Sequence, residues 1–208
     1  MISREEHLQI TQKIRAAEKK TSGEIFAVVA RTSDGYFFVS GFVAALWALA
    51  FGLVAALAFA WRGEFLSPLW LVGMQIVTFL IFLLIFQLFP TLRLWFVPRN
   101  VAYRRASANA VRQFLAHGIH DTTGRSGILL FVSIAERYAE VVADSGINEK
   151  VDQAHWDEII TILTSHAAED DLGAGFVLAV EKSGKLLAEH FPPKRGKANE
   201  LDDKVVEL

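Results

Sequence analysis

The stretch RTSDGYFFVSGFVAALWALAFG, residues 31–52, changes character within a few positions. It begins with a charged and polar turn of the kind that follows a strand in a water-exposed domain. After Asp34 the chain is free of charge until Arg62 and is mostly apolar. The sequence therefore predicts two regions that face different surroundings, with a boundary near residue 36.

Two long uncharged runs follow one another. About 27 residues separate Asp34 from Arg62, and about 28 separate Glu64 from Arg93. Each run exceeds the roughly 20 residues that a helix needs to cross the hydrocarbon core of a membrane. A buried helical hairpin of a soluble protein is the alternative, but two such runs back to back are rare in soluble folds. We therefore expect a transmembrane helical hairpin over residues 37–92.

The composition places this apolar excess in one part of the chain. Of 208 residues, 52% are hydrophobic while 21% are still charged. The formal net charge of −2 gives no general attraction to nucleic acid, so we expect no nucleic-acid partner. The absence of cysteine excludes disulfides, thiolate metal sites and cysteine nucleophiles.

Basic residues flank the predicted hairpin on its two outer sides. The loop between the runs, residues 62–68, has Arg62 as its one positive charge. The flanks contain Arg4, Lys13, Arg15, Lys19, Lys20 and Arg31 before the hairpin, and Arg93, Arg99, Arg104, Arg105 and Arg112 after it. Because basic flanks prefer the cytoplasm, we expect both termini on the cytoplasmic side and a short external loop. The first expected partner is the lipid bilayer.

The remaining segments alternate between helical and strand patterns. Ser3 and Glu6 have the spacing of a capping box before a helix, and residues 24–31 are apolar on both faces, like a covered central strand. The elements predicted after the hairpin are a helix over residues 100–118, two strands within 127–147 with a turn near 135–137, and helices over 152–170 and 171–191.

A single strand cannot form a sheet, so strand 24–31 must pair with the later strands. The hairpin is then an insertion within one α/β domain, whose parts are residues 1–36 and 93–191. The tail, residues 192–208, contains enough apolar residues to dock. We also expect Phe26 and Val28 to share a core with Leu129, Phe131 and Val141.

Four segments together resemble the TPM domain family, and in particular its bacterial membrane branch, in which two spans interrupt the domain after the first strand. These segments are AAEKKTSGEI (16–25), GRSGILLFVSIAERYAEVVADSGI (124–147), GFVLAVEKSGKLLAEHFP (175–192) and NELDDKVVEL (199–208). The resemblance implies an α/β sandwich with a small mixed sheet between helices, interrupted by the transmembrane hairpin. It also implies the bacterial inner membrane, and the charge flanks place the domain in the cytoplasm.

Two groups of polar residues are candidate metal ligands. His117, His120 and Asp121 could hold zinc, although the helix end at Gly118 breaks the geometry between them, and a polar loop at a helix end is the alternative. Asp34, Asp144 and Asp152 follow strand ends or begin a helix, where oxygen ligands could bind Ca²⁺ or another divalent cation. Ordinary turn and capping chemistry explains these aspartates equally simply.

No segment combines a nucleophile, a base and an orienting group in a known spacing. TTGRSG (122–127) lacks the G-K-[ST] of a phosphate-binding loop, and Ser126 does not lie in a nucleophile elbow. We therefore expect a non-catalytic module that binds or assists a membrane protein complex. The alternatives are a metal-assisted acid phosphatase, since the family takes its name partly from one, and a calcium-responsive binding module.

Overall fold

The computed structural model describes residues 2–193 and 199–208. Its elements in chain order are α1 (Arg4–Glu18), β1 (Glu24–Ala30), α2 (Phe37–Trp61), α3 (Pro68–Leu88), α4 (Thr91–Trp95), α5 (Arg99–Ala116), the 3-10 helix η1 (Ile119–Asp121), β2 (Gly127–Ser133), β3 (Tyr138–Ala143), α6 (Ser145–Asn148), α7 (Gln153–Ala168), α8 (Leu172–His190) and β4 (Val205–Glu207). The short elements α4, η1, α6 and β4 were not expected from the sequence.

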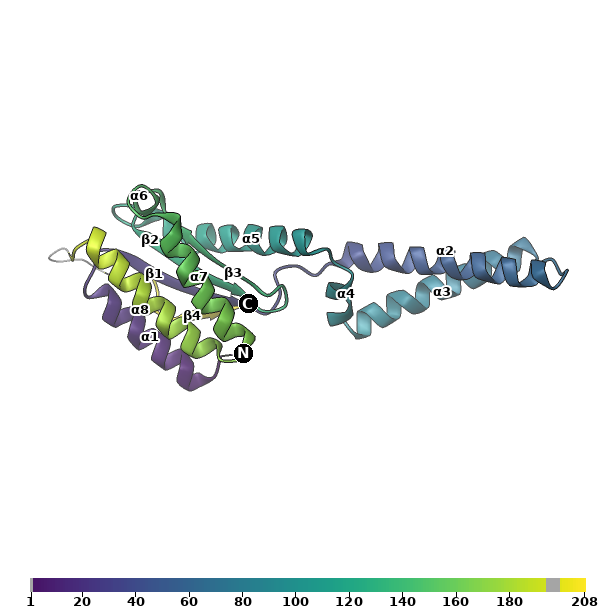
Figure 1. The fold of residues 1–208 in the computed structure, drawn as a ribbon, viewed down its shortest axis with the longest axis horizontal. Coiled ribbons are helices and arrows are strands. Elements are labelled where there is room, and N and C mark those ends of the chain that lie inside the picture. The colour runs from purple at the N-terminus through teal and green to yellow at the C-terminus, as the bar shows by residue number, and fades with distance from the viewer. Residues whose placement is uncertain (1, 194–198) are drawn as a thin grey trace. The chain divides into compact units, whose positions relative to one another are not determined.

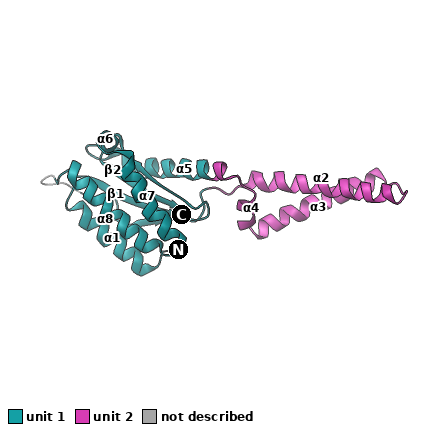
Figure 2. Ribbon diagram, in the orientation of Figure 1, with its two compact units in different colours: residues 1–33, 103–208 teal, residues 34–102 magenta. Residues whose placement is uncertain are grey.

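The chain divides into two compact units, which Figure 2 shows in different colours. The first, the α/β unit, comprises residues 1–33 and 103–208. The second, the hairpin unit, comprises residues 34–102. The α/β unit is thus built from two chain segments that the hairpin unit separates in the sequence.

A four-stranded mixed sheet organises the α/β unit, with the strand order β3-β2-β1-β4 (Figure 1). β1 pairs in parallel with β2 and with β4, whereas β2 and β3 form an antiparallel hairpin. All seven residues of β1 are buried. The prediction of a covered central strand that pairs with strands beyond the hairpin is therefore confirmed.

Helices cover both faces of this sheet. On one face, Ile25, Ala27 and Val29 of β1 pack with Ile128, Leu130 and Val132 of β2 and with residues of α1, α7 and α8. On the other face, Phe26 and Val28 pack with Leu129, Phe131 and residues of α5. The prediction for Val141 is wrong, because Val141 pairs with Leu130 and faces α7 and α8, while its neighbour Val142 joins Phe26 and Val28.

Local sequence signals set several element ends. Ser3 and Glu6 form the predicted capping box at the start of α1. Gly118 adopts a left-handed conformation, with φ of 65°, directly after α5, as expected for a helix-terminating glycine. The expected docking of the tail takes the form of β4, whose Val205 and Val206 pair with Ala27 and Val28.

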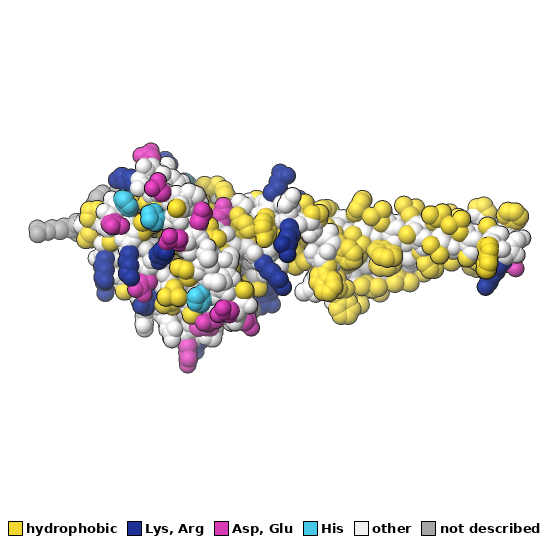
Figure 3. Space-filling view, in the orientation of Figure 1, with side chains coloured by type: hydrophobic (Ala, Val, Ile, Leu, Met, Phe, Trp, Pro, Cys, Tyr) yellow, Lys and Arg dark blue, Asp and Glu magenta, His cyan; other side chains and the backbone are white. Residues whose placement is uncertain are grey.

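The hairpin unit consists mainly of α2 and α3, two helices long and apolar enough to span a membrane. At about 1.5 Å per residue they are about 37 Å and 31 Å long, against a hydrocarbon core of about 30 Å. Only 22% of the most apolar window of α2 and 6% of that of α3 are buried. Figure 3 shows these helices covered almost continuously by hydrophobic side chains.

Side-chain shape holds the two helices together. Gly52 lies against the side chain of Gln75, and a Cβ atom at Gly52 would collide with the amide of that glutamine. Trp47 stacks on Phe82, with ring centroids 5.8 Å apart and planes inclined by 8°. A small residue opposite a large polar one is the close packing that membrane helices use, since lipid offers no hydrophobic drive for association.

Arg93 closes the base of the hairpin. The residue is 6% exposed, and its guanidinium donates from Nε and Nη2 to the carbonyl oxygen of Phe86 and from Nη1 to that of Gly35. The helical partner of the Phe86 carbonyl would be the N–H of residue 90, but residue 90 is proline and has none. Arg93 supplies the missing donor and joins the end of α3 to the residues that precede α2.

Candidate functional site

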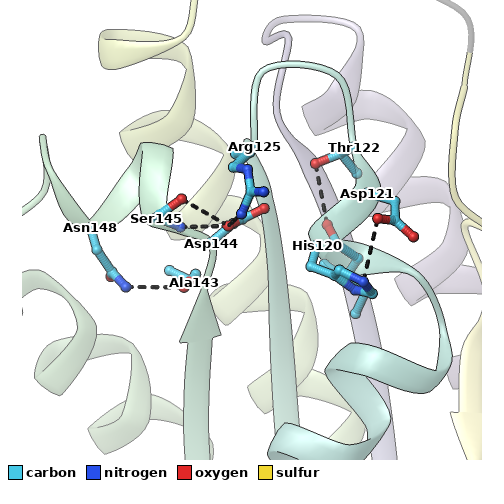
Figure 4. A network of polar contacts seen from close by, with 9 residues as sticks. His120, Asp121, Thr122, Arg125, Ala143, Asp144, Ser145 and Asn148 are labelled. Atoms are coloured by element: carbon cyan, nitrogen blue, oxygen red, sulfur yellow. Dashed lines mark hydrogen bonds and ion pairs between the residues drawn. The ribbon is translucent and has the colours of Figure 1, made fainter.

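Polar residues gather at both ends of the strands of the sheet. Asp144 follows the last residue of β3, at the end of the sheet where β2 begins, and its N–H donates to the Gly127 carbonyl. Arg125 lies in the loop that leads into β2 (Figure 4). Among the aspartates predicted as ligands, Asp144 at this end of the sheet is the one that is buried.

The two oxygens of Asp144 differ. Oδ1 accepts from the backbone N–H of Ser145 at 2.6 Å and from its hydroxyl at 3.2 Å, and it lies 3.8 Å from Nη1 of Arg125. Oδ2 is buried and has no hydrogen-bond partner among the described residues. The whole residue is 5% exposed. A buried carboxylate oxygen without a donor is costly, and Arg125 is the nearest compensating charge in Figure 4.

The loop that presents Arg125 has a constrained backbone. Gly124 and Arg125 have φ values of 86° and 49°. Gly146 packs so closely under this loop that a Cβ atom would lie 2.7 Å from the Arg125 carbonyl oxygen and 2.8 Å from that of Gly124. The sequence pattern D-S-G at residues 144–146 is therefore explained by local packing, because only glycine fits beneath the loop.

The histidines of the HGIHD segment do not form one centre. His117 packs its ring against Phe26, with centroids 4.5 Å apart. His120 contacts Asp121 instead, with 3.3 Å between Nε2 and Oδ1, as Figure 4 shows. The helix end at Gly118 thus directs the two rings to different partners.

Two of the three aspartates predicted as cation ligands, Asp34 and Asp144, are placed apart. Asp34 accepts the N–H of Tyr36 at 3.0 Å, in the turn that leads into α2. Asp34 comes four residues after the end of β1, where Ala30 pairs with Ser133. Asp144 lies at the opposite end of the strands, directly after Ala143, which pairs with Ile128. Strands of this length separate the two ends of the sheet by about 20 Å. Asp152 precedes α7 as its N-cap, without a side-chain capping bond.

The described residues do not fit a calcium centre built on these three side chains. Calcium takes six to eight oxygen ligands, and the described part of the chain contains no group of three or more His, Asp or Glu side chains that could hold a metal ion. Asp144 offers one buried oxygen beside a guanidinium, which is itself a competing positive charge. Of the three aspartates, Asp144 is the one whose buried oxygen lacks a hydrogen-bond partner among the described residues, so a bound cation would improve its surroundings.

The opposite end of the strands has a hydrogen-bond network that the sequence did not reveal. Glu136 is 6% exposed and accepts from the Ser133 hydroxyl at 2.5 Å, the Thr32 hydroxyl at 3.1 Å and the Ser33 N–H at 3.0 Å. The hydroxyls of Ser33 and Ser133 are 2.7 Å apart, and Asn109 of α5 donates to Ser33 at 3.4 Å. This network joins the residues after β1 to the turn after β2.

A second carboxyl lies between β3 and α5. Glu140 accepts from the Ser107 hydroxyl at 3.3 Å and from the Tyr138 hydroxyl at 3.1 Å. Burial raises the pKa of Glu140 above its ordinary value and raises the pKa of Tyr138 to about 12. The Glu136 carboxyl accepts from the Thr32 hydroxyl after β1, and the Glu140 carboxyl accepts from the Ser107 hydroxyl of α5. These bonds connect the β2–β3 hairpin to the segment after β1 and to α5.

Signals for these two carboxyls are weak in the sequence. Glu136 stands in the segment SIAER, where an acidic residue in a turn between strands is ordinary, and Glu140 alternates with apolar residues along β3. Besides the neighbouring Ser133 and Tyr138, their partners are Thr32, Ser33 and Ser107, which are distant in the chain. Only the pairing of β1 with β2 and the placement of α5 bring them together.

Comparison with known proteins supports the fold and gives a family match for part of the chain. Residues 92–186 match the sequence family described as the TPM domain. The BA42 protein of the psychrophilic bacterium Bizionia argentinensis, solved by NMR, is similar in structure, with a TM-score of 0.61 and 19% identity over 100% of this chain and 96% of BA42. No curated protein matches the chain. The α/β unit has the mixed sheet between helices that was expected, and residues 92–186, which make up most of its second chain segment, are similar to the TPM domain.

Proposed function

We propose that this chain is an integral protein of the bacterial inner membrane with its TPM domain in the cytoplasm. In this proposal the domain is a non-catalytic module that binds or assists a membrane protein complex. The hairpin anchors it to the bilayer at two points, because the chain leaves the domain after β1 and returns to it through α5. The observation on which the proposal chiefly depends is the exposed apolar surface of α2 and α3.

That surface is incompatible with water. Soluble monomers rarely expose contiguous apolar patches of more than a few hundred Å². Along the hairpin, Leu57 is 62% exposed, Leu69 82% and Leu84 58%. A core helix of a soluble protein would have most of its window buried, whereas α3 has 6%. A lipid environment accounts for this exposure without requiring a covering protein along the whole hairpin.

The ends of the hairpin have the residues that membrane interfaces favour. Trp61 and Trp70 flank the loop between the helices, and Trp95 lies in α4 at the other end, with exposures of 91%, 72% and 86%. Tryptophan prefers the headgroup level, where its ring is buried and its N–H can still hydrogen-bond. The basic flanks described above support a cytoplasmic position for the end that contains Trp95.

The polar groups of the α/β unit favour recognition over catalysis. Glu136 accepts three hydrogen bonds from the fold, so it is poorly placed to take a proton from a substrate. Arg125 is 66% exposed and pairs only loosely with Asp144. Phosphoryl transfer needs several positive groups aimed at one phosphate, and a single exposed arginine supplies little of that stabilisation.

A second candidate, a calcium-responsive module, is favoured by one observation, the unpartnered Oδ2 of Asp144. A divalent cation there would satisfy this oxygen and compete with Arg125. Asp144→Asn removes the charge at nearly constant shape, and Asp171→Asn is the matched control, at an exposed aspartate that is not among the predicted ligands. A calcium-dependent rise in melting temperature that only Asp144→Asn abolishes would favour this candidate over simple partner binding.

The test of the main proposal uses the full chain extracted in native membrane discs. We expect it to elute with a membrane protein in fixed stoichiometry, and we expect no efficient hydrolysis of an aryl phosphate with magnesium, calcium, manganese or zinc. Turnover near the roughly 10 per second typical of enzymes, abolished by Asp144→Asn, would contradict the non-catalytic role and favour the acid phosphatase. Elution of the chain alone under several mild extractions would contradict the role in a complex.

A further inference from the structure

The strand β3 forms one lateral edge of the sheet, because β2 is its one neighbour in the described sheet. The backbone groups of successive residues in a strand point alternately to its two sides. The Asp144 N–H donates to the Gly127 carbonyl, so every second residue of β3 counted back from Asp144 points its backbone groups toward β2. The residues between them point their N–H and C=O groups away from the sheet, and these are Ala139, Val141 and Ala143.

Most of these outward groups are free. The Ala143 carbonyl accepts from Nδ2 of Asn148 at 3.0 Å. The N–H and C=O groups of Ala139 and Val141 have no hydrogen-bond partner among the described residues. These two residues thus present two donors and two acceptors in a row, which is the pattern to which a further strand can pair.

Little in β3 discourages such pairing. Proteins usually protect an exposed strand edge with proline, with lysine, with a bulge or by making the edge strand very short. The sequence of β3 is YAEVVA, without Pro or Lys, and all six of its residues pair in register with β2. Its one charged side chain, Glu140, accepts from the hydroxyls of Ser107 and Tyr138. The other outer strand, β4, is protected by its length of three residues.

A cavity of about 520 Å³ lies beside the beginning of β3. Its lining includes the apolar residues Val132, Ala139, Ala167, Ala168 and Leu172. Arg137 and Asp170 add one charge of each sign, so the lining has no net charge. A residue that pairs with Ala139 from a further strand would place its side chain on the same face of the sheet as Ala139, beside this cavity. One apolar side chain of an added strand can therefore be buried there.

The charge of this part of the chain selects between possible occupants. Residues 136–208 contain 16 Asp and Glu against eight Lys and Arg. Opposite charges on directly facing strand residues are favourable, so a basic residue suits the position opposite Glu140. Pairing of two β3 strands from two copies of this chain would bring two acidic surfaces together. Segments of membrane proteins beside their spans on the cytoplasmic side are, by contrast, rich in Lys and Arg.

We propose that the free edge of β3 binds an extended basic segment of a membrane protein by strand addition. The segment pairs its backbone with Ala139 and Val141, places an apolar side chain in the cavity and sets a Lys or Arg opposite Glu140. In this mode main-chain hydrogen bonds provide affinity and alternate side chains provide selectivity. The inference rests on the proposed role of the domain in a membrane protein complex, and it names the surface that binds.

The first test uses a synthetic peptide as the probe, with the full chain in lipid discs. In this blocked peptide Val alternates with Thr, and the central Thr is replaced by Lys. Saturating peptide should slow hydrogen exchange of the Val141 amide at least about tenfold, because this amide gains a partner. The Val142 amide, which points toward β2, should exchange as before. The same peptide methylated on its Val nitrogens lacks the donors for the edge and should leave Val141 unchanged.

A proline at the edge provides the second test. Val141→Pro removes an outward N–H that takes no part in the pairing with β2, so the strand can keep its place in the sheet. It should weaken peptide binding at least about fivefold, which is the factor that one net hydrogen bond contributes. Val141→Thr keeps the N–H and should bind as the parent does. The comparison of the two peptides does not depend on the folding of either variant.

Several outcomes would overturn the proposal. The absence of slowing at Val141 with the unmethylated peptide is one, and equal slowing by the methylated peptide is another. Slowing at Val141 that follows the concentration of the chain without peptide would identify a second copy as the occupant. If the chain is extracted together with a membrane protein, retention of that protein by Val141→Pro would overturn the β3 site and leave the proposed function intact. Elution of the chain alone, with Val141 protected by the peptide, would support strand addition at β3 and contradict only the proposed function.

Discussion

Replacement of Arg93 should open the base of the hairpin. Its guanidinium makes three hydrogen bonds to two carbonyl groups, and it lies 4.5 Å from the ring centroid of Phe37. Arg93→Met keeps much of the length and removes all the donors. Because Pro90 cannot replace the lost donor, the Phe86 carbonyl is left without its partner, and the Gly35 carbonyl loses its bond to Arg93.

The magnitude follows from those two carbonyls. An unsatisfied buried polar group costs about 1–3 kcal/mol, so the closed base should lose about 2–6 kcal/mol. Arg93→Lys keeps the charge but has a single ammonium in place of a fork, and it should retain only part of this stability. Arg99→Met is the matched control, since it removes an exposed arginine from the same flank.

The chain has no cysteine, so one introduced thiol can report the opening. Ser40 is 5% exposed, and its hydroxyl has no hydrogen-bond partner among the described residues, so Ser40→Cys removes no bond of the described structure. In the reconstituted chain, Arg93→Met should accelerate labelling of this thiol by a water-soluble maleimide at least about 30-fold, since 1.4 kcal/mol corresponds to a factor of ten. Equal labelling rates in Arg93→Met and the parent would refute the structural role of Arg93. Equal acceleration by Arg99→Met would show that net charge, and not the hydrogen bonds, controls the base.

Two other substitutions test the packing of each unit. Gly52→Leu should separate α2 from α3, because the new side chain collides with Gln75, and the distance between spin labels on the two helices should increase. Val28→Asp buries a charge between Phe26 and Phe131 and should cost several kcal/mol. Proteolysis should then attack the segment after residue 103 as readily as the segment before residue 33, and continued protection of the later segment would mean that the two do not share one core.

Hydrophobic patterns in the sequence predicted the covered β1 strand, its partners beyond the hairpin and the helices on both faces. They did not place Val141, because the side that a strand residue faces changes with a shift of one residue in register. That register is set by the turn at residues 134–137, which pairs Ser133 with Tyr138. The faces of β3 were therefore undetermined until the turn was known.

The candidate ligands show a different limit. Asp34 and Asp144 both follow strand ends, but β1 and β3 run in opposite directions, so the two residues lie at opposite ends of the strands. The short connection between β2 and β3 already implied this direction, since so few residues can join only antiparallel neighbours. The Glu136 network and the base closure by Arg93 depend on side chains distant in sequence, and no local pattern marks them.

The orientation of the hairpin is tested most directly by two single-cysteine variants in intact cells. Ser67 is exposed in the loop that we place outside the cytoplasm, and Ser165 is exposed on α7 of the domain that we place inside. A small, membrane-impermeant maleimide should label Ser67→Cys in intact cells, and it should label Ser165→Cys only after lysis. The reverse pattern would contradict the cytoplasmic position of the domain, and identical labelling of both variants before lysis would contradict the insertion of the hairpin across the membrane.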